Sequence, residues 1–257
     1  MITSYLQGGL GNQLFQISAA IALALENNDK TAFDIKNHDL PKQGRKCEKY
    51  LTTIFRNLNF SSNLPIKHVY REPRFSYDKI AYETDMCLVG YFQSEKYFDK
   101  YASEIRKLFS MDNHSRNVIN NKYGEILANN TVAVHVRRGD YVKFSETHPP
   151  CSLKYYNEAI TTFAPNTTFL FFSDDIAWCK KNFVQDNFIF IEENEDLVDL
   201  YLISMCCNAI LSNSSFSWWG AWLNNKADKR IIAPKNWFGP TISHNTKDLI
   251  PSHWETL

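Results

Sequence analysis

The stretch TVAVHVRRGD, residues 131–140, decides which fold this chain adopts. Its first six residues form an apolar run rich in valine, which is typical of a strand buried on both faces of a parallel sheet. An arginine pair and a glycine follow directly, so the strand leads into a turn that carries positive charge. Amphipathic segments flank the strand at 115–128 and 152–163. The stretch therefore predicts a unit of an α/β fold.

Short apolar runs and amphipathic segments continue to alternate toward the C-terminus. This alternation is typical of helices packed on a parallel sheet. Strands are expected at 131–136, 169–172, 188–191, 209–211 and 230–233. Helices are expected at 115–128, 152–163 and 195–207, with two more that begin after Asp175 and at 214–216.

The N-terminal part shows the same pattern in a weaker form. A strand is expected at 2–6, followed by a glycine-rich loop and a helix that Asn12 caps. Residues 36–75 show no clear pattern. Further strands are expected at 31–35 and 87–92, and a helix at 94–109 that Ser94 caps.

Two such runs predict two Rossmann-like lobes that face each other across a cleft. We expect an N-terminal lobe at 1–110, a second lobe at 111–240 and a C-terminal tail at 241–257.

Composition excludes several classes of protein. The 257 residues carry 28 basic and 28 acidic side chains, so no overall charge favours nucleic acid or an anionic membrane. The apolar run Ile17–Leu25 is far too short to span a bilayer and lacks the flanks of a signal peptide. We therefore expect a cytoplasmic protein with at most peripheral membrane association. The six cysteines show no CxxC spacing, which predicts free thiols and no zinc site.

The basic pair Arg137-Arg138 falls at the carboxyl end of a strand, where ligands bind in open α/β sheets. Two guanidinium groups followed by Gly139 suit bidentate capture of a diphosphate and stabilise the charge of a departing one. Asp140 is placed to orient one of the arginines. A surface arginine pair bridged to Asp140 is the equally weighted alternative.

A second candidate anion site is SNSSF, residues 212–216, which follows an apolar strand and opens a helix. The first backbone N–H groups of that helix, with the polar side chains of Asn213, Ser214 and Ser215, form an anion site without net charge. Phe216 lies in the same turn. The alternative is an ordinary helix start with Trp218 and Trp219 packed in the core.

Acidic residues supply two further candidates. Asp174 and Asp175 follow another strand, where they fit a helix cap or a polar contact with a nucleotide better than a metal site. Asp199 lies in a helix that is apolar almost all round, so its carboxylate needs a partner. A guanine edge and a buried polar side chain are equally good partners.

The loop GGLGNQLFQ, residues 8–16, resembles a dinucleotide-binding turn but has Leu14 where the third glycine belongs. Asp34 ends the next expected strand, so binding of NAD remains an alternative. We favour a loop whose glycines, Gly11 among them, let the backbone approach a cleft.

Four of these segments together resemble the inverting α-1,2-fucosyltransferases of glycosyltransferase family 11. The segments are GGLGNQLFQ at 8–16, LVGYFQSEKYF at 88–98, VAVHVRRGDYV at 132–142 and SNSSFSWWGAWL at 212–223. The resemblance implies a GT-B-type architecture with the donor bound by the second lobe and the acceptor by the first. It implies transfer of L-fucose from GDP-β-L-fucose to the 2-hydroxyl of a galactosyl glycan, with inversion and without a metal or another cofactor. A role in bacterial polysaccharide or lipopolysaccharide synthesis follows from the same resemblance.

The resemblance also assigns roles to residues. It places His135 at the guanine, Arg137 at the β-phosphate and Asp199 at the guanine edge. Ser214 and Ser215 match phosphate-binding serines, and Asn12 matches an asparagine that reaches the cleft. The general base stays open between Asp140, Glu146 and His148.

Two other classes of function stay open at this stage. One is an NAD-dependent oxidoreductase that uses the N-terminal glycine loop, and Leu14 argues against it. The other is a glycan-binding protein without catalysis, for which the aromatic content of 14% would suffice.

Overall fold

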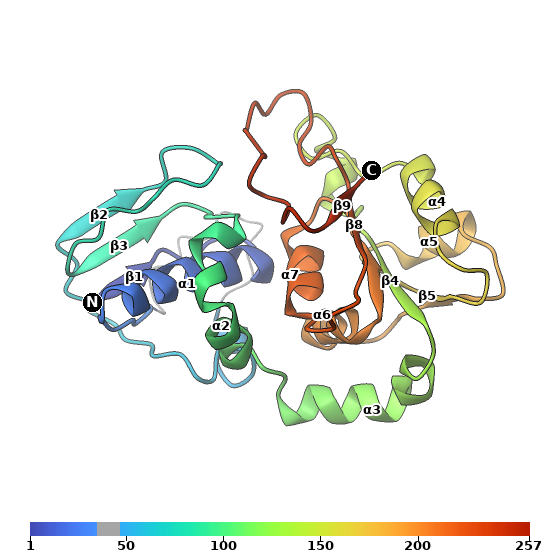
Figure 1. Ribbon diagram of the computed structural model, residues 1–257, viewed down its shortest axis with the longest axis horizontal. Coiled ribbons are helices and arrows are strands. Elements are labelled where there is room, and N and C mark those ends of the chain that lie inside the picture. Colours follow the sequence, from blue (N-terminus) through green and yellow to red (C-terminus); the bar gives the residue numbers. More distant parts are fainter. Residues whose placement is uncertain (35–46) are drawn as a thin grey trace. The chain divides into compact units, whose positions relative to one another are not determined.

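In the computed structural model, which describes residues 1–34 and 47–257, the strands form two parallel sheets (Figure 1). Each sheet belongs to its own compact unit. Unit 1 comprises Met1–Asp112 and His244–Pro251, and unit 2 comprises Asn113–Ser243 and Ser252–Leu257. The mixed α/β class expected from the alternating pattern is confirmed.

Unit 1 contains a three-stranded sheet in the order β1-β3-β2. The strands are β1 (Ile2–Ser4), β2 (His68–Arg71) and β3 (Met86–Val89). The long helix α1 (Leu10–Glu26) packs against β1 and buries most of its side chains. Shorter helical segments are η1 (Cys47–Tyr50), η2 (Glu95–Tyr97), η3 (Asp99–Tyr101) and α2 (Ala102–Leu108).

Three expectations for unit 1 are corrected. Asn12 does not cap α1, because Gly8 turns the chain with φ +77° and the helix begins earlier, with Gly9 as its cap. Residues 31–34 form only isolated bridges, Ile2 with Thr31 and Phe33 with Phe60, and Ile35 lies outside the described residues. The helix expected at 94–109 is interrupted, because Phe98 adopts φ −145° between η2 and η3.

Unit 2 contains a six-stranded sheet in the order β6-β5-β4-β7-β8-β9. Its strands are β4 (Thr131–Val136), β5 (Thr168–Ser173), β6 (Phe188–Phe190), β7 (Asn208–Ile210), β8 (Ile231–Ala233) and β9 (Glu255–Thr256). Counted from β4, this is the strand order 3-2-1-4-5-6 of a Rossmann sheet. The order reverses between β4 and β7, and in such sheets that switch point is where ligands bind.

Helices cover both faces of this sheet, with α4 and α5 on one side and α6 and α7 on the other (Figure 1). The helices of unit 2 are α3 (Asn113–Leu127), α4 (Leu153–Thr161), α5 (Ile176–Asn182), α6 (Asp196–Met205) and α7 (Ser215–Leu223). The single turn η4 (Asp140–Val142) follows β4.

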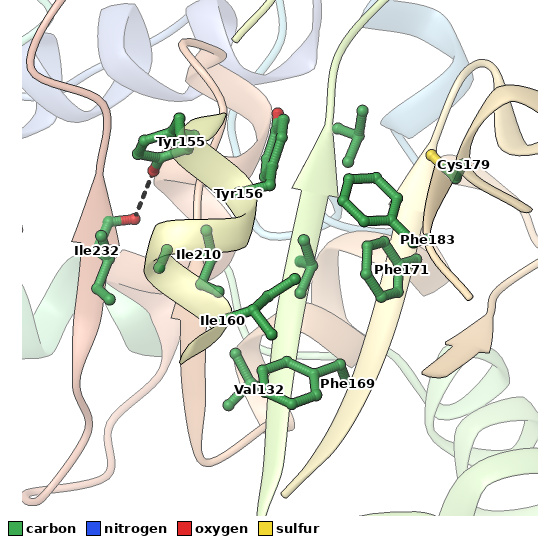
Figure 2. Close-up of a cluster of buried hydrophobic side chains, with 13 residues drawn as sticks. Val132, Tyr155, Tyr156, Ile160, Phe169, Phe171, Cys179, Phe183, Ile210 and Ile232 are labelled. Carbon is green, nitrogen blue, oxygen red and sulfur yellow. Dashed lines mark hydrogen bonds between the residues drawn. The ribbon is translucent and has the colours of Figure 1, made fainter. Parts of the chain in front are cut away.

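Two tyrosines of α4 fasten the helix to the strand ends while their rings fill the core (Figure 2). The Tyr155 hydroxyl donates to the carbonyls of Leu211 (2.7 Å) and Ile232 (3.2 Å). The Tyr156 hydroxyl donates to the carbonyl of His135 (3.1 Å). These bonds satisfy polar groups that burial would otherwise leave unpaired, and they hold α4 against the segments of β4, β7 and β8.

The opposite face is packed by tryptophans of α7. Trp218, Trp219 and Trp222 contact one another, and Trp254 packs on Trp218 at 5.3 Å between ring centres. All six tryptophans of the chain lie in unit 2, at positions 178, 218, 219, 222, 237 and 254.

Residues 241–257, expected as a tail, divide between the units. In unit 1, Asp248 accepts bonds from Lys96 Nζ (2.5 Å) and the Tyr77 backbone N–H (3.1 Å). In unit 2, β9 extends the sheet beside β8. The six cysteines are free thiols. Among the described helices, none has both the length and the apolar character needed to cross a bilayer.

Candidate active site

Three of the segments that the sequence analysis singled out lie at one edge of the unit 2 sheet. β4 pairs in parallel with both β5 and β7, so the residues that follow these three strands share the carboxyl edge of the sheet. Arg137 and Arg138 follow β4, Asp174 and Asp175 follow β5, and the SNSSF segment follows β7. The arrangement brings two cations and a helix start to the switch point.

Two carboxylates hold the Arg137 guanidinium. Its Nη2 lies 2.5 Å from Asp140 Oδ1, and its Nη1 lies 2.9 Å from Asp174 Oδ2. The side chain remains 34% exposed, and the guanidinium lies 5.2 Å from the centre of the Tyr141 ring. The bridge to Asp140 that the sequence offered as an alternative is therefore formed, and it fixes an arginine that still faces solvent.

Arg138 is packed more closely than Arg137 and is 19% exposed. Its Nε donates to Asp175 Oδ2 (3.2 Å), and its guanidinium lies 3.9 Å from the centre of the Trp178 ring. The guanidinium thus makes a cation–π contact through one face and an ion pair through its Nε edge. Arg138 therefore anchors the turn to α5.

Asp174 organises the turn after β4. Besides Arg137, it accepts a bond from the backbone N–H of Arg138 at 2.8 Å. Gly139 has φ 7° and lies so close to Asp174 that a Cβ atom there would collide with the carboxylate. Glycine at this position thus lets Asp174 reach Arg137.

Asp175 caps helix α5, as one of the sequence alternatives proposed. Its Oδ1 accepts the backbone N–H of Trp178 at 3.2 Å. Since Asp174 and Asp175 are each paired with an arginine, their charges are already compensated. Over the described ranges, no group of three acidic, histidine or cysteine side chains is arranged to hold a metal.

His135 connects the two strands at the switch point. Its Nδ1 lies 2.7 Å from Ser212 Oγ, and its ring centre lies 5.6 Å from that of Phe216. The side chain is 7% exposed. Burial, aided by the Arg137 charge, lowers the pKa of His135 to about 3, so the imidazole is neutral at physiological pH.

In the segment after β7, the asparagine and the serines play different parts. The Asn213 amide donates to the carbonyls of Pro149 (3.0 Å) and Trp237 (2.9 Å), so this buried side chain holds loops together. Ser214 is the N-cap residue of α7, but its side chain makes no capping bond. Ser215 and Phe216 form the first turn and are half-buried.

Asp199 has a buried polar partner of the kind that the sequence left open. Its Oδ1 accepts a bond from Asn194 Nδ2 at 2.9 Å. Burial raises the pKa of Asp199 to about 6 in spite of that bond.

Gly11 and Asn12 belong to unit 1, whereas the other candidate residues belong to unit 2. Gly11 is buried in the first turn of α1. The Asn12 Oδ1 accepts a bond from Gln93 Nε2 at 2.8 Å, which joins two of the family-like segments, 8–16 and 88–98.

The three general-base candidates belong to the segment that follows β4. Asp140 is engaged with Arg137. The backbone carbonyl of Glu146 accepts a bond from Thr241 Oγ1 (2.6 Å), which anchors the loop. The His148 ring packs between Tyr141 and Phe238, at 5.2 and 5.5 Å.

Three residues of interest escaped the sequence-based reasoning. Tyr141 packs on Arg137, and Asn194 holds Asp199. Glu72, in the weakly patterned stretch, accepts the backbone N–H groups of Tyr91 (2.7 Å) and Phe92 (3.0 Å), and burial raises its pKa to about 7. The sequence pointed to Glu72 indirectly, since the backbone N–H groups that it accepts belong to the segment 88–98 that the sequence analysis singled out.

Comparison with known proteins places these features in one family. Glycosyl transferase family 11 matches residues 1–256. An α-1,2-colitosyltransferase of Escherichia coli is 32% identical, with 99% of this chain and 98% of the relative covered. The O-antigen biosynthesis glycosyltransferase WbnK of Escherichia coli is 31% identical over 99% of both chains. A galactoside 2-α-L-fucosyltransferase of Caenorhabditis elegans is 29% identical over 100% of this chain and 79% of the relative.

Solved structures share the fold at low sequence identity. The fucosyltransferase NodZ from Bradyrhizobium is 13% identical with a TM-score of 0.53, over 86% of this chain and 91% of that one. A fucosyltransferase of Arabidopsis thaliana in complex with GDP is 14% identical with a TM-score of 0.51, over 97% and 74%. Since the family match spans nearly every residue and two relatives exceed 30% identity along almost their whole length, the chain belongs to glycosyltransferase family 11.

Proposed function

We propose that this chain transfers L-fucose from GDP-β-L-fucose to the 2-hydroxyl of a galactosyl glycan, with inversion and without a metal. The observation that carries the proposal is the Arg137 guanidinium, held by two carboxylates at the end of β4, beside the strand that leads into α7. A diphosphate at this switch point would meet a fixed cation and the N-terminus of a helix. We assign the two units to the two lobes of a GT-B-type enzyme, with the donor site in unit 2.

In the proposed reaction, the bond between fucose C1 and the β-phosphate oxygen breaks, and the phosphate keeps the electron pair. The acceptor hydroxyl oxygen attacks C1 from the opposite face, which inverts the configuration, and the hydroxyl proton is released to a base or to water. Charge builds on the departing GDP, so the preorganised guanidinium of Arg137 stabilises the transition state more than the ground state. The first turn of α7, with Ser214 and Ser215, supplies further donors to the diphosphate.

The acidic residues have supporting roles in this scheme. Asp140 and Asp174 orient Arg137, and Asp199 accepts the N1–H and N2–H donors of guanine. The Asp140 carboxylate is engaged by the Arg137 guanidinium, so we assign it to the positioning of that arginine. Neutral His135 fits a contact with the uncharged base rather than with phosphate.

The relatives support the reaction class and also favour a second candidate donor. Names printed for them include 2-α-L-fucosyltransferase and α-1,2-colitosyltransferase, and both describe transfer of a deoxysugar. NodZ, which shares the fold, was crystallised with GDP. Similarity to WbnK supports a role in O-antigen synthesis. A colitose donor is therefore the second candidate.

The deciding experiment incubates the protein with GDP-fucose or GDP-colitose and a panel of β-galactosides. We expect mass spectrometry to show one added fucose and linkage analysis to place it on the 2-hydroxyl. If a product forms only from GDP-colitose, GDP-colitose replaces GDP-fucose as the proposed donor. Glycan binding without any transfer would favour the non-catalytic alternative instead.

A further inference from the structure

Three side chains of unit 2 form a hydrogen-bonded relay that ends on Asp199. The Tyr123 hydroxyl, on α3, donates to Asn194 Oδ1 at 3.1 Å. Asn194 Nδ2 donates to Asp199 Oδ1, on α6, at 2.9 Å. The Tyr123 side chain is buried, whereas Asn194 and Asp199 are half-buried. The relay thus connects the core of the unit to a carboxylate that a ligand can reach.

The relay fixes the orientation of the Asn194 amide. The Asp199 carboxylate can only accept, so the NH₂ group of Asn194 faces it, and the amide oxygen is left to accept the bond from the Tyr123 hydroxyl. A flipped amide would set its oxygen against the carboxylate. The backbone also contributes, because Glu193 adopts φ +61°, a left-handed conformation that non-glycine residues seldom adopt. Such local strain is characteristic of functional sites.

Within residues 1–34 and 47–257, Asn194 is the side chain that donates to the Asp199 carboxylate, so the other lone pairs remain for a ligand. The charged groups around Asp199 are Asp196, which raises its pKa, and Lys122, which lowers it, while Tyr123 approaches from α3. Burial is the largest influence and raises the pKa of Asp199 to about 6. The Asn194 N–H group opposes this by favouring the charged form.

We propose that Tyr123 and Asn194 are positioning residues for nucleobase selection, which hold the Asp199 carboxylate in the orientation that pairs with the N1–H and N2–H donors of guanine. This inference rests on the proposed function, because it takes GDP as the ligand. A carboxylate held on one side by the relay presents two acceptors in a fixed plane. A freely rotating carboxylate discriminates less well between bases.

The test compares the binding of GDP with that of IDP, whose base lacks the 2-amino group, by calorimetry. In Tyr123→Phe and Asn194→Ala we expect the GDP-to-IDP affinity ratio to fall about tenfold, since a hydrogen bond to a charged group is weakened or lost. Asp199→Asn should abolish the preference. The KM for GDP-fucose should rise in the two relay variants while kcat changes by less than about twofold.

A pH series gives a second, independent readout. Guanine pairs with the carboxylate form, so GDP affinity should fall as the pH drops through about 6. In Asn194→Ala the pKa of Asp199 should be higher still, so the fall should begin at a higher pH. Asn187→Ala is the matched control, because its Nδ2 donates to the Thr167 carbonyl (2.8 Å) elsewhere in unit 2. We expect it to leave both the ratio and the pH curve unchanged.

The outcomes separate this inference from the proposed function. An unchanged ratio in both relay variants, with a lost preference in Asp199→Asn, would overturn the relay and leave the function standing. If the relay variants bind GDP and IDP more weakly by the same factor, Tyr123 and Asn194 have a merely structural role, and the proposal is likewise overturned. No GDP binding by the unmodified protein would instead reject the proposed function.

Discussion

Arg137 combines a fixed position with an exposed charge, because Asp140 and Asp174 grip it from two sides. A lysine in its place keeps the charge but lacks the fork that spans both carboxylates and a diphosphate. We expect Arg137→Lys to lower kcat/KM by about 10²–10³-fold, the effect of removing a donor aimed at the departing charge. Steady-state kinetics with varied GDP-fucose measures this. Arg74→Lys, an exposed residue of unit 1 paired with Asp78, is the control and should behave like the parent. Comparable activity of the two variants would contradict the proposed role of Arg137.

The contact between His135 and Ser212 holds β4 to the segment after β7. Ser212→Ala leaves a buried ring nitrogen without its partner, and we expect it to lower the free energy of unfolding by about 1–3 kcal/mol. Urea denaturation measures the loss. Ser204→Ala is the comparison, because the Ser204 hydroxyl donates back to its own helix, at 2.7 Å from the Tyr201 carbonyl. Equal effects of the two substitutions would show that the His135 contact carries no special weight.

At the scale of elements, α6 and α7 pack closely because Gly220 lies between them. A Cβ atom there would come within 2.6 Å of Ile203 Cγ2 and 2.9 Å of Ile203 Cβ. We expect Gly220→Ala to destabilise unit 2 by about 1–3 kcal/mol through overpacking, despite the better helix propensity of alanine. Gly124→Ala on α3 meets no atom within 4 Å and should stabilise by roughly 0.5–1 kcal/mol. Opposite signs in urea denaturation are the expected result. A higher free energy of unfolding in both Gly220→Ala and Gly124→Ala would show that the contact at Gly220 is not tight.

The two long strands buried on both faces were predicted well by the sequence pattern. β4 and β5 lie within a residue or so of their expected bounds because every position faces a helix layer. β2 and β9 are short and largely exposed, so no apolar run marked them. The residues of the candidate site also divide into those that a sequence pattern indicates and those that it does not. Arg137 and Ser214 could be proposed together because parallel strands place their carboxyl ends at one edge of the sheet. Tyr123 and Asn194 meet across 71 residues, and no local pattern indicates that contact.

For the whole molecule, the balanced charge means that affinity for an anionic donor must come from the local site. We expect GDP at 100 times its Kd to stabilise the fold by about 2.7 kcal/mol through mass action, which a thermal-shift assay detects. NAD at the same concentration should give no shift. The reverse pattern would favour the oxidoreductase alternative.

The pairing of Asp174 and Asp175 with arginines leads to a further expectation for the intact enzyme. Carboxylates whose charge is compensated make poor ligands for a divalent cation. We expect the turnover rate to be unaffected by EDTA and by added Mg²⁺ or Mn²⁺. A rate that collapses with EDTA and recovers with Mg²⁺ would restore a metal-binding role for these acids.

The confinement of all six tryptophans to unit 2 makes this half of the chain its own fluorescent label. Selective excitation of indole reports on the candidate donor unit alone, while far-ultraviolet circular dichroism reports on both units. Superimposable unfolding curves from the two probes would show that the units unfold as one cooperative system. Separated curves would give each unit its own stability, without any labelling or dissection of the chain.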